Sequence, residues 1–195
     1  MMPQTDWLGL ARESVFNPRL AARAILRMGL PMKVLRQALL LVSILTDLLM
    51  FAELAAGGGA TFLLGTAVPD PIALAGMQFA SLVVTSLALY GIGRMFGGRG
   101  DLAGAMALVI WMQVIMLGFG LAQTVAYFLL PGLGNALGLA SIVMMLWLLT
   151  QFTLELHGFT NAWLVFLGII AGALVLVFSL SFLLMAFGVF VPGVA

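Results

Sequence analysis

Five long apolar runs, separated by short stretches rich in glycine, proline and polar residues, make up most of the sequence after residue 34. A helix that crosses the hydrocarbon core of a bilayer needs about 20 consecutive, mainly apolar residues. Each run is long enough, and we expect membrane-spanning helices at about 35–56, 72–93, 102–130, 134–156 and 162–189. The pattern therefore predicts an all-α, polytopic membrane protein whose residues 35–195 form one five-helix transmembrane domain.

Residues 1–34 have a different pattern, in which cations are interspersed with apolar residues. Asn17 has a side chain suited to a helix N-cap, and Pro18 fits the first position of the helix that follows. A basic amphipathic helix next to a membrane span usually lies in the lipid interface. We therefore expect this cytoplasmic segment to form short amphipathic helices on the membrane surface.

Three arginines of this segment, Arg19, Arg23 and Arg27, recur every four residues and form one basic stripe along a helix. Two interpretations of this stripe remain open. It can be a solvated face held against anionic lipid headgroups, or it can be a docking surface for a protein partner.

The composition agrees with a membrane protein. The chain is 64% hydrophobic and only 8% charged, whereas a soluble domain is about 25% charged. There are no cysteines, which excludes disulfides, thiolate metal sites and cysteine nucleophiles. His157 is the single histidine, so a multi-histidine metal site within one chain is excluded as well. We expect no catalytic, cofactor-binding or metal-binding residue, and no nucleic-acid partner.

The positions of the cations predict the orientation of the chain. Residues 1–36 contain six of the eight lysines and arginines, and Arg94 and Arg99 lie in the stretch 93–101 between the second and third runs. Because cytoplasmic loops are enriched in Lys and Arg, we expect an N-inside, C-outside topology. The glycines of that stretch predict a tight turn, and Asp101 is expected to cap the third span. The two arginines are candidates for contact with headgroup phosphates or a partner.

Seven polar side chains stand out as candidates within the predicted spans or, for His157, at the end of one, where ionisable groups are costly and a functional role is the default hypothesis. They are Asp47, Glu53, Gln113, Gln123, Gln151, Glu155 and His157. Asp47 lies about 12 residues into its span, or about 18 Å deep. It can form a proton or ion relay with Glu53, or it can be a neutral carboxyl hydrogen-bonded to a neighbouring helix, with one of the three glutamines as partner.

The end of the fourth span combines an acid with the single histidine. Gln151 and Glu155 are four residues apart and share a face of the helix. His157 can pair with Glu155 or cap the helix end, where a cationic imidazole is favoured. General acid–base chemistry by this pair is possible. The sequence puts no nucleophile beside it, which argues against a serine hydrolase, and we expect a structural role at the helix end.

Pairs of glycines four residues apart occur in three places, and such pairs let two helices approach closely. They suit a compact bundle, a homo-oligomer or contacts with other subunits. The pairs are Gly100/Gly104, Gly134/Gly138 and Gly168/Gly172.

Several short motifs occur in an order and spacing that resemble one family. They are Asn17-Pro18-Arg19, then Gly93–Gly100 leading into Ala107–Trp111, then Pro131, then Leu146–Leu149 running into Phe152–Phe159. With them the chain resembles, over nearly its whole length, bacterial members of the Ypt/Rab-interacting-protein (Yip) domain family. The resemblance implies five spans, a cytoplasmic N-terminus and no established enzymatic activity. Eukaryotic relatives act in vesicle trafficking, membrane shaping and binding of prenylated small GTPases, but their Asp-Leu-Tyr-Gly-Pro signature is absent here.

These observations favour one function and leave an alternative. The leading hypothesis is a non-enzymatic, multi-pass protein of the bacterial inner (cytoplasmic) membrane, a scaffold or accessory subunit that acts through helix–helix and headgroup contacts. Its partners would be membrane lipids together with a protein partner, a larger membrane complex or a second copy. The alternative is a small proton, ion or solute transporter that uses Asp47, Glu53 and Glu155. An intramembrane enzyme has no supporting constellation of residues.

Overall fold

The computed structural model describes residues 6–55 and 70–186. Within these ranges the chain is helical and contains no strand. The helices are α1 (Trp7–Phe16), α2 (Pro18–Arg27), α3 (Met32–Ala55), α5 (Pro71–Met95), α6 (Leu102–Leu129), α7 (Pro131–His157) and α8 (Ala162–Ala186). The all-α class predicted from the sequence is confirmed.

Five of the helices, α3, α5, α6, α7 and α8, are long and apolar enough to cross a membrane. The described residues thus contain the predicted number of candidate spans, and their helix bounds agree with the prediction within a few residues. Residues 56 and 187–189 of the predicted spans lie outside the described residues. Helix α3 begins earlier than predicted, because its first turn forms directly after Pro31, whose carbonyl accepts hydrogen bonds from the amides of Val34 and Leu35. Backbone hydrogen bonding continues past the end of an apolar run, so hydropathy alone underestimates helix length.

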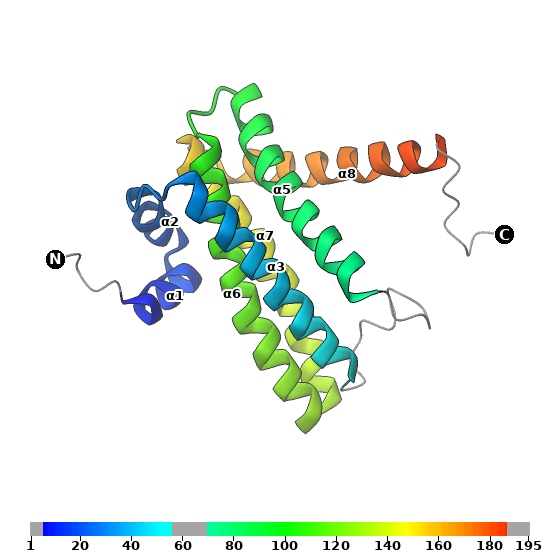
Figure 1. The fold of residues 1–195 in the computed structure, drawn as a ribbon. Coiled ribbons are helices and arrows are strands. Elements are labelled where there is room, and N and C mark those ends of the chain that lie inside the picture. The colour runs from blue at the N-terminus through cyan, green and yellow to red at the C-terminus, as the bar shows by residue number, and fades with distance from the viewer. Residues whose placement is uncertain (1–5, 56–69, 187–195) are drawn as a thin grey trace.

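Helices α3, α5, α6 and α7 run alongside one another, and α6 contacts each of the other three (Figure 1). The first half of α6 is the centre of the bundle, since the six consecutive residues Gly104–Val109 are all buried. A helix buried on every side must be apolar on every side, which explains why this run shows no polar stripe. Small residues such as Ala105 and Ala107 let the neighbouring helices approach closely there.

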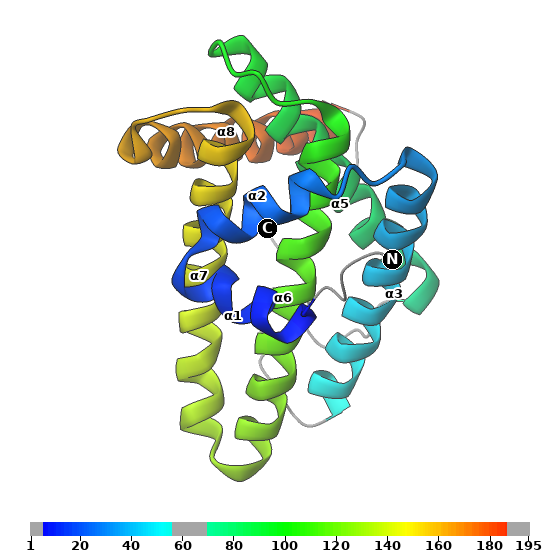
Figure 2. The ribbon, with the colours of Figure 1, turned by 90° about the vertical axis from the view of Figure 1, so that its left-hand side faces the viewer.

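Helices α1 and α2 form a hairpin that packs against the flank of α6 and α7 (Figure 2). Pro18 occupies the first helical position of α2, as predicted. Asn17 stands at the N-cap, but its side chain makes no capping hydrogen bond; its backbone carbonyl accepts from Leu20 and Ala21 instead. Ala21 and Ala22 are completely buried. This hairpin therefore has a face covered by protein, whereas its predicted position on the membrane surface stays a prediction.

The turn between α5 and α6 agrees with its prediction. Gly97 has a φ of 84°, a left-handed conformation that favours glycine. Asp101 caps α6, because its carboxylate accepts a hydrogen bond from the amide of Gly104 at 3.0 Å.

Helix α8 runs across the other long helices instead of alongside them (Figure 1). It follows Gly158, which has a φ of 72°, and Asn161, whose side chain accepts from the amides of Trp163 and Leu164. The part of α8 that could span a membrane, Ala162–Ser179, is hardly covered by the rest of the described chain, with Val165 as its buried residue. Its length and composition suit a membrane, while the C-outside topology stays a prediction.

Candidate functional site

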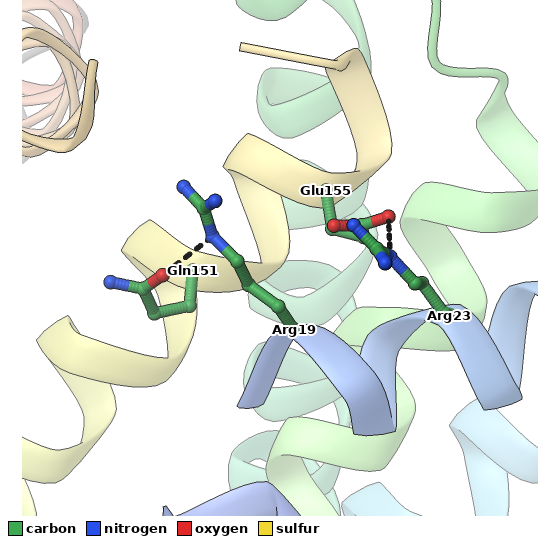
Figure 3. A network of polar contacts seen from close by, with 4 residues as sticks. All are labelled: Arg19, Arg23, Gln151 and Glu155. Carbon is green, nitrogen blue, oxygen red and sulfur yellow. Dashed lines mark hydrogen bonds and ion pairs between the residues drawn. The ribbon is translucent and has the colours of Figure 1, made fainter. Parts of the chain in front are cut away.

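The basic stripe of α2 packs against the last two turns of α7. The Nε of Arg19 donates to Oε1 of Gln151 at 3.0 Å, and the Nε of Arg23 donates to Oε1 of Glu155 at 2.6 Å (Figure 3). Both pairs join residues 132 positions apart. The two helices therefore run in the same direction here, with the four-residue spacing of one matching that of the other.

These contacts decide how two of the three stripe arginines are used. The hydrogen bond and charge of Glu155 raise the pKa of the Arg23 guanidinium above its ordinary value. Gln151 and Glu155 do share a face, as predicted, and that face is turned toward α2 (Figure 3). From the sequence, lipid headgroups or a protein partner were predicted to contact the stripe. A partner within the same chain was not predicted.

Arg27, the third stripe residue, has no hydrogen bond or ion pair to any described residue. Together with Arg23, Leu26 and Glu155 it lines an open hollow beside the end of α2. The position on α7 that would continue the register lies at residue 159, beyond the end of the helix at His157. Arg27 therefore has no α7 partner four residues beyond Glu155 of the kind that Arg19 and Arg23 have.

Arg94 lies in the last turn of α5 and Arg99 in the α5–α6 turn, both with exposed side chains. The guanidinium of Arg94 is 5.9 Å from the centre of the Tyr90 ring, at the distance of a cation–π contact. The backbone amide of Arg99 donates to the carbonyl of His157 at 3.3 Å. Contact of these two side chains with lipid headgroups stays a prediction.

His157 is buried and holds the α5–α6 turn to the end of α7. Its Nδ1 accepts a hydrogen bond from the amide of Gly100 at 3.2 Å, and its Nε2 lies 3.0 Å from the carbonyl oxygen of Leu89. Because Nδ1 accepts, the ring proton is on Nε2, which donates to Leu89 in the neutral tautomer. The ring also stacks on Phe159 with centroids 5.4 Å apart.

The surroundings of His157 correct one prediction and explain the glycines of the turn. His157 pairs neither with Glu155, which binds Arg23, nor with the helix end, where Gly158 is the C-cap. A methyl group at Gly93, Gly98 or Gly100 would overlap with the imidazole ring. From the sequence these glycines were predicted to form the turn, and Gly100 also to belong to a helix-packing pair with Gly104, but none was expected to make room for a histidine ring. The signal that could have revealed their second role is one histidine together with an unusual density of glycine.

Asp47 is buried in α3, and its Oδ2 has no hydrogen-bond partner among the described residues. None of the three glutamines proposed as its partner bonds to it. The side-chain amide of Gln113 donates to Oγ1 of Thr46 at 3.0 Å, Gln151 accepts from Arg19, and Gln123 lies against Gly138. The predicted hydrogen bond from a glutamine is therefore wrong.

Glu53 has its own hydrogen-bond partner, which it does not share with Asp47. Its Oε1 accepts from Oγ1 of Thr124 on α6 at 3.2 Å. The two acids are six residues apart on one helix, or about 9 Å along its axis, so they do not touch. The structure thus leaves Asp47, Glu53 and Glu155 in three distinct surroundings.

Trp111 of α6 contacts α1, and this contact was not predicted from the sequence. Its indole Nε1 donates to Oγ of Ser14 at 2.7 Å, and its ring centre is 5.9 Å from that of Trp7. An indole N–H in an apolar region needs an acceptor, but nothing in the sequence identifies a serine 97 residues away as that acceptor.

The fold and these contacts define a polytopic α-helical membrane protein with an N-terminal helical hairpin docked on its bundle. The Yip1 domain matches residues 12–185, and the chain belongs to the Yip1 domain family. The matched region includes the arginine stripe, the α5–α6 turn and most of α8, which confirms the resemblance seen in the sequence. Neither the curated proteins nor the solved structures contain a match to this chain.

Proposed function

We propose that this protein is a non-enzymatic scaffold or accessory subunit of the bacterial inner membrane, acting through helix–helix and lipid-headgroup contacts. The proposal rests mainly on one observation, which is that polar groups within the candidate spans form hydrogen bonds between helices. Gln113 bonds to Thr46 and Thr124 bonds to Glu53, and both bonds join α6 to α3. Polar bonds of this kind hold helices together within a bilayer.

The transport alternative gains no support from the same geometry. Glu155 is near the end of α7 that contacts α2, where its Oε1 is bound by Arg23. Glu53 bonds to Thr124 near the last turns of α6, at the opposite end of the bundle (Figure 1). Asp47 contacts neither. A relay requires groups linked by hydrogen bonds or water, whereas these acids are separate.

The glycine pairs indicate where another helix could pack. Gly100/Gly104 and Gly134/Gly138 are occupied within the chain, because side chains of His157, Leu156, Tyr127 and Gln123 lie against them. In α8, by contrast, a methyl group at Gly168 would meet no atom within 4 Å, and one at Gly172 would meet only Ile92. The pair in α8 therefore has room for a partner helix or for a second copy of the chain.

The first test is purification of a tagged copy from its native membrane in mild detergent, followed by mass spectrometry. We expect one defined complex, or a second, differently tagged copy, to co-purify in stoichiometric amount. Gly168→Leu should abolish this association while the variant still folds, whereas Gly118→Leu on α6, another position with no atom within 4 Å, is the matched control. A lone protein that shows turnover or ion flux would overturn the proposal.

We further propose an N-inside, C-outside topology, which is supported by the positions of the cations in the sequence, before or at the start of the first span or between the second and third, and by the length of α8. A C-terminal alkaline phosphatase fusion should then be active and a C-terminal green fluorescent protein fusion dark. The reverse pattern would overturn the C-outside assignment. If the N-terminus were then found inside, α8 would not cross the membrane, in agreement with its position across the bundle (Figure 2).

A further inference from the structure

The hollow beside the end of α2 combines positive charge with an apolar wall. It has a volume of about 460 Å³ and is lined by Arg23, Leu26, Arg27 and Glu155. Two guanidinium groups face one carboxylate, so the lining carries one net positive charge. We propose that this hollow binds the phosphate of an anionic phospholipid, with Arg27 as the principal ligand.

The contacts along the stripe single out Arg27. Arg19 and Arg23 both use their Nε to hold α7, and the charge of Arg23 is balanced by Glu155. Arg27 is exposed, and its guanidinium bonds to no described residue. A guanidinium offers five N–H donors in a planar fork that matches phosphate oxygens. Arg27 can therefore bind a phosphate without breaking any contact of the folded chain.

Arg23 is held in a position to assist. Its Nε is fixed on Glu155 at 2.6 Å, which leaves its terminal N–H groups free of other described partners. The ion pair thus positions a second set of donors on the wall of the same hollow. A phosphate bound between the two arginines would meet donors from successive turns of α2.

The apolar side chain of Leu26 favours a phospholipid over a free anion as the ligand of the hollow. Its side chain lines the hollow and also packs against the hydrophobic core. Leu30, just before α3, and Met32, its first residue, follow in the chain and are exposed apolar residues. Inorganic phosphate would use only the arginines, whereas the glycerol and acyl part of a phospholipid would also use the apolar wall.

This inference deepens the headgroup contact in the proposed function, but its test does not depend on a protein partner. The purified protein would be equilibrated in detergent with equal amounts of phosphatidylglycerol and phosphatidylcholine, and bound lipid would be counted by native mass spectrometry. We expect the wild type to retain one phosphatidylglycerol in preference to phosphatidylcholine. Arg27→Gln should reduce this preference about tenfold, as loss of a charge-assisted hydrogen bond implies.

Arg36→Gln is the matched control, because it removes the same charge from an exposed arginine that does not line the hollow. We expect it to bind like the wild type, and we expect all three proteins to have the same melting temperature. An unchanged preference in Arg27→Gln, or an equal loss in Arg36→Gln, would overturn the site in favour of diffuse attraction. Displacement of the lipid by millimolar inorganic phosphate would overturn the lipid as the occupant. None of these outcomes depends on whether a protein co-purifies.

Discussion

Gly93→Ala is expected to destabilise the protein by about 3 kcal/mol, at the upper end of the cost of overfilling a packed core. Gly93 is buried in α5, and a methyl group there would overlap with the His157 ring. The ring cannot retreat freely, because Gly100 and Leu89 bind its two nitrogens. Thermal unfolding of the purified protein in detergent would measure the loss. Gly91→Ala is the matched control, since a methyl group at that position meets no atom within 4 Å.

A double-mutant cycle assigns the effect to the histidine. In a His157→Ala background the overlap is removed, so Gly93→Ala should cost much less than it does in the wild type. His157→Ala alone should be destabilising, because it leaves a cavity and deprives the amide of Gly100 of its acceptor. If the two substitutions are additive, the glycines serve the turn alone and His157 does not hold the α5–α6 turn to α7.

Asp47→Asn is expected to stabilise the protein by about 1 kcal/mol, because burying an ionised carboxylate whose Oδ2 has no described partner costs more than burying a neutral amide of the same size. Oδ2 of Asp47 has no partner among the described residues, so the substitution removes no hydrogen bond from that atom. The same thermal unfolding measurement applies. Glu53→Gln is the matched control and should be close to neutral, because the amide oxygen can still accept from Thr124.

The opposite result would be equally informative. A clear loss of stability in Asp47→Asn would mean that the carboxyl group has a partner that requires it, supplied by another subunit or a bound ion. It would also revive the transport alternative, and proteoliposome flux with the same variant would then decide between the two. An Asp47 that can be replaced without loss would leave the acid without a role in the fold.

Features that depend on neighbouring residues were predictable from the sequence. The number of long apolar helices follows from run length, the position of Pro18 follows from its fixed φ, and the cap at Asp101 follows from its place before an apolar run. The positive φ at Gly97 belongs to the same group. Each of these features depends on residues that are close together in the sequence, so it can be predicted from the local pattern of residue types.

Features that depend on distant residues were not predictable. The bond between Trp111 and Ser14 and the pairing of α2 with α7 join residues 97 and 132 positions apart. The sequence identified Arg19, Arg23, Gln151 and Glu155 as polar residues of interest. It assigned the arginines to headgroups or a protein partner, Gln151 to Asp47, and Glu155 to His157 or to the transport alternative. Their use was decided by the register between two helices, which no local pattern contains.

The sequence by itself determined the class of this protein, its helices and its candidate polar residues, because burial in a bilayer requires apolar runs whose length can be read directly. Only the tertiary structure decided which of those residues have a partner within the chain. It placed His157 among three glycines, gave two stripe arginines to α7 and left Arg27 without a described partner. The physical reason is that a hydrogen bond requires its two atoms within about 3 Å of each other, and that distance is set by how the helices pack.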